Sequence, residues 1–126
     1  MIRIFRTKTF YRWMRKNGVS DDDLRQAVME MNEGLIDADL GGGVFKKRIA
    51  SHSHGKRGGS RALVATNLGD RWFFVFGFAK NERSDLSARE LRALKALAAD
   101  LLQYSDQELQ KAHISKVLKE ITYGNH

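Results

Sequence analysis

Basic side chains and glycines are concentrated in one stretch of the chain, residues 40–69. This stretch carries six Lys or Arg residues and no Asp or Glu, and within it residues 55–61 read GKRGGSR. Glycine lets a backbone approach a ligand closely, and Lys or Arg laid against a phosphate releases its condensed counterions. The stretch therefore predicts a surface that binds a phosphate-bearing polyanion.

The whole chain has the same bias, but its charges are segregated. It has 126 residues, a net charge of +7 and a pI near 9.9. Residues 1–20 carry six basic and no acidic side chains, whereas residues 21–39 carry seven acidic and one basic. We expect one face of the molecule to meet phosphates and another to meet cations or solvent.

Strand alternation indicates which of these cations act together. In FKKRIA, Lys46 and Arg48 fall on one face of a strand and Lys47 falls on the other. If Arg61, at the start of the next strand, projects from the first face, three cations surround one patch of sheet. Lys80, at the end of the following strand, would be a fourth.

Such a cluster suits RNA chemistry. A 2′-hydroxyl attacks its own 3′-phosphate when a base accepts its proton, cations stabilise the transition state, and an acid protonates the leaving 5′-oxygen. Arginine is no base at neutral pH, but a lysine destabilised by neighbouring cations could be one. The alternative is that these charges only solvate an exposed sheet face.

Histidines and acids near the cluster have simpler interpretations. His52 and His54, in SHSHGKR, could be metal ligands or an acid and base pair, but no Cys or convergent carboxylate accompanies them. We expect no bound metal, and a surface role for His54 in contact with RNA. In KNERSDL we expect Glu82 or Asp85 to pair with Arg83 and order a turn.

Periodicity and capping signals predict a mixed α and β chain. Ser20 with Asp23, Ser87 with Glu90, and Ser105 with Glu108 form capping boxes, and the dense aromatics of residues 71–79 indicate a buried central strand. The predicted strands are 2–5, 44–50, 62–67 and 71–79, and the predicted helices are 8–17, 21–33, 88–103 and 106–121. The last three strands form an antiparallel meander.

Composition excludes several function classes. The absence of cysteine removes disulfides, thiolate metal sites and Cys nucleophiles, and no apolar run approaches membrane-spanning length. We therefore expect a soluble, cytoplasmic protein with one domain over residues 1–126, in which residues 105–126 form an additional C-terminal helix and tail.

The order of a basic strand, a GKRGGSR loop and an aromatic strand that ends in KNERSDLSARE resembles the RelE/ParE superfamily of type II toxins. The similarity is greatest to the HigB-like branch. It covers about residues 1–103, with motif detail in residues 44–91. It implies an α+β, microbial-RNase-like fold, in which an N-terminal strand and two helices pack on an antiparallel sheet and one or two C-terminal helices follow.

The resemblance also implies an activity. Such a toxin is a metal-independent, cofactor-free endoribonuclease that enters the ribosomal A site, contacts 16S rRNA, cuts mRNA by 2′-hydroxyl attack, and is neutralised by a cognate antitoxin. The implied catalytic residues are Lys46, Arg48, Arg61 and Lys80, and the implied RNA contacts are Lys47, His54, Lys56, Arg57 and Arg83.

Two positions depart from the family pattern. RelE has an Arg where this chain has Asn81 and a catalytic Tyr where it has Ser87. Either Lys80 and another group take the catalytic roles of that Arg and Tyr, or the activity is altered. Two other hypotheses therefore stay open, a non-catalytic nucleic-acid-binding module and an inert toxin relative that only binds an antitoxin.

Overall fold

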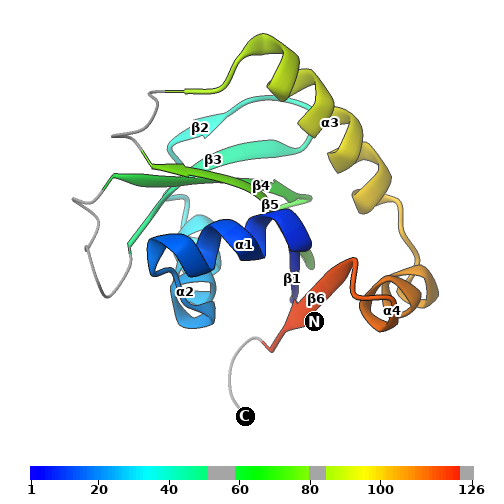
Figure 1. The fold of residues 1–126 in the computed structure, drawn as a ribbon. Helices are drawn as coiled ribbons and strands as arrows, with labels where there is room; N and C mark the ends of the chain where they lie inside the picture. Colours follow the sequence, from blue (N-terminus) through cyan, green and yellow to red (C-terminus); the bar gives the residue numbers. More distant parts are fainter. Residues whose placement is uncertain (51–58, 80–84, 123–126) are drawn as a thin grey trace.

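The fold is a mixed six-stranded sheet with helices on both faces (Figure 1). The computed structural model describes residues 1–50, 59–79 and 85–122. Its elements are β1 (Arg3–Thr7), α1 (Lys8–Asn17), α2 (Asp21–Asn32), β2 (Ala38–Asp39), β3 (Val44–Ile49), β4 (Ser60–Thr66), β5 (Arg71–Ala79), α3 (Ala88–Leu102), α4 (Asp106–Ile114) and β6 (Leu118–Ile121).

The strands lie in the order β2-β3-β4-β5-β1-β6. The meander of β3, β4 and β5 is antiparallel, as the sequence predicts. Only β1 departs from this pattern among the described strands, because it runs parallel to β5 while β6 pairs with it in the antiparallel sense. The sheet is therefore mostly, and not wholly, antiparallel.

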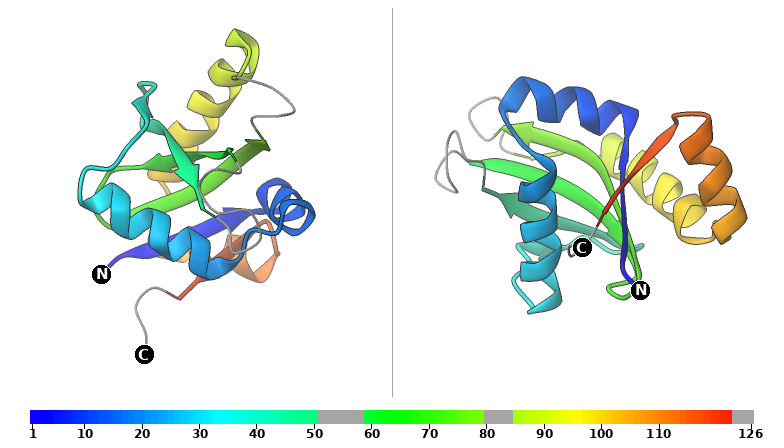
Figure 2. Two further views of the ribbon diagram at one scale, coloured as in Figure 1. Left: turned by 90° about the vertical axis from the view of Figure 1, so that its left-hand side faces the viewer. Right: turned by 90° about the horizontal axis from the view of Figure 1, so that it is seen from below.

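Two apolar cores lie on opposite faces of this sheet. One joins the sheet to α1 and α2, and the other joins it to α3 and α4 (Figure 2). Trp72, Phe73 and Phe74 of β5 are fully buried and alternate between the two cores. The aromatic run is thus a central strand covered on both sides, and its rings are core and not a stacking platform for bases.

The helix boundaries follow from local capping chemistry. All three predicted capping boxes are present, at the starts of α2, α3 and α4. Helix α1 ends at Gly18, whose φ of 68° is a left-handed conformation that glycine adopts without steric strain. No helix in the described ranges is both long and apolar enough to cross a membrane.

The predicted C-terminal helix over 106–121 is wrong beyond Ile114. The amides of Lys116 and Val117 bond back to the carbonyls of His113 and Ala112, at 3.1 and 3.0 Å, and close the helix in a Schellman motif. The chain then becomes strand β6. The apolar spacing of Leu118 and Ile121 fits a helix, but in the strand these residues point into the two different cores.

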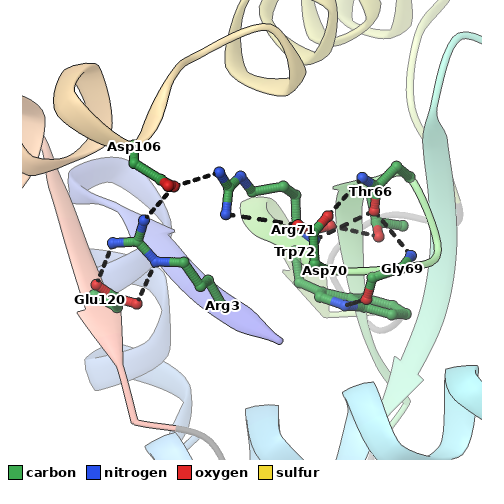
Figure 3. A network of polar contacts seen from close by, with 9 residues as sticks. Arg3, Thr66, Gly69, Asp70, Arg71, Trp72, Asp106 and Glu120 are labelled. Atoms are coloured by element: carbon green, nitrogen blue, oxygen red, sulfur yellow. Dashed lines mark hydrogen bonds and ion pairs between the residues drawn. The ribbon is translucent and has the colours of Figure 1, made fainter. Parts of the chain in front are cut away.

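A polar network fastens this C-terminal unit to the sheet (Figure 3). The guanidinium of Arg3 donates to both carboxylate oxygens of Glu120 at 2.9 and 2.8 Å, and to Asp106 at 2.9 Å. Arg71 donates to the same oxygen of Asp106 at 2.6 Å. This hydrogen bond from Arg71 is the main reason that the pKa of Asp106 lies below its ordinary value. The network joins β1, β5, β6 and α4.

Candidate nucleic-acid interface

Three of the predicted site residues lie on one face of the sheet. In the register of β3 and β4, Arg48 is directly opposite Arg61, and Lys46 is opposite Leu63. These residues share the face of Val44 and Leu63, which is the α3 side of the sheet. The structure thus places Lys46, Arg48 and Arg61 together, as alternation predicts.

Two carboxylates that no sequence pattern predicts here approach this cluster. Arg61 Nε lies 3.5 Å from Asp37 Oδ2, and Lys46 Nζ lies 3.4 Å from Asp85 Oδ2. Asp37 directly precedes β2, and Asp85 lies shortly before α3, so both acids come from outside the acid-free stretch of 40–69. The sequence around these cations contains no acid, but the fold brings two acids from other segments next to them.

Both pairs are loose. A well-formed charge-assisted hydrogen bond between nitrogen and a carboxylate is about 2.7–2.9 Å long. The longer separations here, together with side-chain exposures of 29% for Asp37 and 57% for Asp85, leave both carboxylates in contact with water. Ion pairs of this kind stabilise a protein little.

The neighbour of Arg61 on β5 is apolar. Phe78 of β5 is directly opposite Arg61 and is only 3% exposed, and its ring lies 6.4 Å from that of Phe76. The Arg61 side chain itself is only 12% exposed. Charge interactions are screened less beside such low-dielectric groups, so a phosphate here would be held more strongly than one in open solvent.

Lys47 points to the opposite face and does not join the cluster. It is 4% exposed, and its Nζ lies 2.7 Å from Glu30 Oε1 on α2. The other oxygen of Glu30 accepts a hydrogen bond from Gln26 at 3.1 Å. The ammonium of Lys47 is therefore engaged inside the protein, and its position supports a structural role rather than contact with RNA.

Ser87, at the position compared with a catalytic Tyr, caps a helix. Its hydroxyl accepts a hydrogen bond from the Glu90 amide at 3.1 Å, and its own amide donates to the Glu90 carboxylate at 2.9 Å. This reciprocal pairing satisfies amide groups that the first turn of α3 leaves open. The hydroxyl of Ser87 is used to start α3.

Several predicted residues fall outside the described part of the chain. These are His52, His54, Lys56, Arg57, Lys80, Asn81, Glu82 and Arg83. Their predicted roles, including the pairing of Arg83 with a neighbouring acid, stay predictions. In the described ranges no cluster of three or more His, Cys, Asp or Glu side chains could hold a metal ion.

The fold and this face define a small α+β protein with a cationic surface on an antiparallel meander. The family model of the RelE toxin of the RelE/RelB toxin–antitoxin system matches residues 2–121. The chain therefore belongs to the RelE toxin family. The match also includes α4 and β6, so it extends beyond residues 1–103, which the resemblance seen in the sequence covers.

Proposed function

We propose that this toxin is a ribosome-dependent endoribonuclease that cuts mRNA in the ribosomal A site, acts in the cytoplasm, and is neutralised by a cognate antitoxin. Membership of the RelE toxin family supports the general class. The observation that carries the proposal is the direct opposition of Arg48 and Arg61, with Lys46 on the same face. Like charges opposite one another destabilise a sheet, and a bound anion would offset that repulsion.

The proposed reaction is an internal transfer at one phosphate. The 2′-oxygen forms a bond to phosphorus and the bond to the 5′-oxygen breaks, which leaves a 2′,3′-cyclic phosphate and a 5′-hydroxyl. One proton leaves the 2′-hydroxyl and one is delivered to the 5′-oxygen. Arg61 stabilises the charge of the transition state, and Lys46 and Arg48 orient the phosphate. Lys80 is proposed from the sequence alone as a group that transfers protons.

The two carboxylates would act before the substrate arrives. Asp37 and Asp85 lie within ion-pair distance of Arg61 and Lys46 in the free protein. A phosphate would take the place of both carboxylates and make shorter bonds to the same cations. His54, Lys56, Arg57 and Arg83 are proposed, again from the sequence, as further contacts to mRNA or to 16S rRNA.

The decisive test is mRNA cleavage on programmed ribosomes. Wild-type protein, an Arg61→Ala variant and a Lys111→Ala control are compared, each also with free RNA. Lys111 is an exposed cation of α4 outside the cluster, so its variant matches the lost charge but not the lost position. We expect codon-positioned cuts with wild type and control, and a loss of at least about a hundredfold with Arg61→Ala.

Other outcomes would contradict the proposal. Equal cleavage by Arg61→Ala would remove Arg61 from the reaction. Cleavage of free RNA at the same rate would remove the ribosome from it. Intact RNA with every protein, despite salt-dependent binding, would indicate a nucleic-acid-binding module without catalysis.

A further inference from the structure

A second cationic site lies at the β6 edge of the sheet, and its lining residues come from β1, α1, α4, β6 and the turn before β6. It is an open pocket of about 610 Å³. Its lining residues are Arg6, Tyr11, His113, Lys116, Leu118 and Lys119. A smaller adjoining hollow adds Lys8. Neither hollow is lined by a carboxylate from the described residues, so this concave surface is strongly basic.

Two cations oppose each other across the strands of this pocket. Arg6 of β1 is directly opposite Lys119 of β6, so their side chains share one face of the sheet. Repulsion in such a pair destabilises the pairing of the two strands. The arrangement parallels that of Arg48 and Arg61, but it stands on different strands and on the opposite face of the sheet.

Arg6 is held in place but incompletely bonded. Its guanidinium lies 3.9 Å from the centre of the Tyr11 ring, and its side chain is only 11% exposed. Its Nε lies 3.4 Å from Asp21 Oδ1, which is within ion-pair distance, yet it makes no hydrogen bond within the described structure. A buried donor without an acceptor is unfavourable, and an anion within hydrogen-bond distance of Arg6 Nε would satisfy it.

Lys116 occupies a backbone conformation that does not favour lysine. It stands at the left-handed position of the Schellman motif, with a φ of 68°. Glycine is the usual residue there because any Cβ is strained in that conformation. Glycine would end α4 equally well. The lysine therefore adds a charge at the rim of the pocket at some cost in stability.

We infer that this pocket is a phosphate-binding site, separate from the cationic face of β3 and β4. Arginine and lysine both bind phosphate well, and a phosphate carries more charge and more acceptor oxygens than a carboxylate. Three cations line the hollow, and within the described structure only Arg6 among them has an acid at ion-pair distance, Asp21 at 3.4 Å, so the lining keeps a net positive charge that a phosphate would match. The inference uses no residue of the β3 and β4 cluster and does not rest on the proposed cleavage.

The test is titration of the full chain with inorganic pyrophosphate, with a nucleoside triphosphate and with a short RNA, followed by the backbone amide NMR shifts of residues 113–119. Lys116→Gly is the main variant, because glycine suits its backbone and the protein should remain folded. We expect it to weaken phosphate binding roughly tenfold, while the thermal midpoint rises by about 3 °C. Lys111→Gln is the charge-matched control and should change neither.

The three probes distinguish a small phosphate ligand from a polynucleotide. Saturable pocket shifts with pyrophosphate or nucleotide support the inference and indicate a small ligand, whereas pocket shifts with RNA alone support it and indicate a polynucleotide. No saturable shifts with any probe would overturn it, as would equal binding of a poly-glutamate peptide. Arg48→Ala should leave phosphate binding in the pocket unchanged. A negative result for pocket binding can therefore be told apart from a negative result for cleavage on ribosomes.

Discussion

Arg48 on β3 and Arg61 on β4 are directly opposed across an antiparallel pair of strands. Replacement of Arg48 by Thr removes the repulsion and adds a good strand former, so the free energy of unfolding should rise by about 0.5–1 kcal/mol. RNA affinity should fall, and the negative slope of log K against log salt should become shallower by about 0.7 for single-stranded RNA. Urea unfolding and fluorescence anisotropy over a salt series measure the two effects.

Arg48→Lys is the matched control for this prediction. It keeps the charge, so it should leave the salt slope unchanged. A loss of stability in Arg48→Thr with an unaltered salt slope would mean that Arg48 serves the fold and not an anion.

Asp37 competes with phosphate for Arg61 in our proposal. Its Oδ2 lies 3.5 Å from Arg61 Nε. Asp37→Asn should therefore strengthen RNA binding about two- to fivefold, which corresponds to the small energy of a partly exposed pair. Anisotropy at fixed salt measures the change, with Asp39→Asn as a nearby exposed control. Weaker binding in Asp37→Asn would show that the carboxylate positions Arg61 for RNA.

The buried pair of Lys47 and Glu30 is expected to serve stability and not RNA binding. The two charged atoms are 2.7 Å apart, with side-chain exposures of 5% and 11%. Lys47→Met leaves the Glu30 carboxylate buried without its cation and should cost about 3–5 kcal/mol of unfolding free energy. The double variant Lys47→Met with Glu30→Leu should recover most of that loss. Denaturant unfolding of wild type, Lys47→Met, Glu30→Leu and the double variant completes a double-mutant cycle.

RNA affinity of the double variant tests the role of Lys47 directly. An unchanged salt slope is expected, because the ammonium lies on the α2 side of the sheet. A salt slope that is shallower by about 0.7 would instead support the contact between Lys47 and RNA that the sequence predicts.

Asp106 should make stability depend on pH. Its pKa is lowered from the ordinary value of 3.8, mainly by the hydrogen bond from Arg71. A carboxyl with a lowered folded-state pKa contributes stability above its unfolded pKa, and this contribution disappears as pH falls through the folded value. Asp106→Asn should thus lower the thermal midpoint at pH 7, and the difference from wild type should close at pH values well below 3.8.

Asp100→Asn, at an exposed acid of α3 outside this network, is the control. Its difference from wild type should show no such closure in acid. A pH-independent difference for Asp106→Asn would mean that the ion pairs with Arg3 and Arg71 contribute nothing and that only packing or helix capping was changed.

Features set by neighbours in the chain were predictable from the sequence. The capping boxes at Ser20, Ser87 and Ser105 place three helix starts, and the alternation in FKKRIA puts Lys46 and Arg48 on one face. Both signals depend on residues a few positions apart. The strand β6 was missed because Leu118 and Ile121 are spaced like a helical stripe, and only the pairing with β1, which is distant in the chain, makes them a strand.

The candidate site was predictable in its cations and not in its acids. Lys46, Arg48 and Arg61 lie on two adjacent strands, so local alternation brings them together. Asp37, next to strand β2, pairs with Arg61, and Asp85, in the loop before α3, pairs with Lys46. No local rule indicates such contacts. Likewise, burial of Lys47 depends on Glu30, which is on another element.

The position of β1 between β5 and β6 has a consequence for how the chain folds. The third residue of the protein pairs with residue 71, and the fourth pairs with residue 121. Contacts so distant in sequence require large loops to close, which slows folding. Strand β1 is synthesised before the other strands of the sheet, but it acquires both of its neighbours only after residue 121 has been made. The sheet is therefore completed late, and a nascent chain that stops before β6 leaves one edge of β1 unpaired.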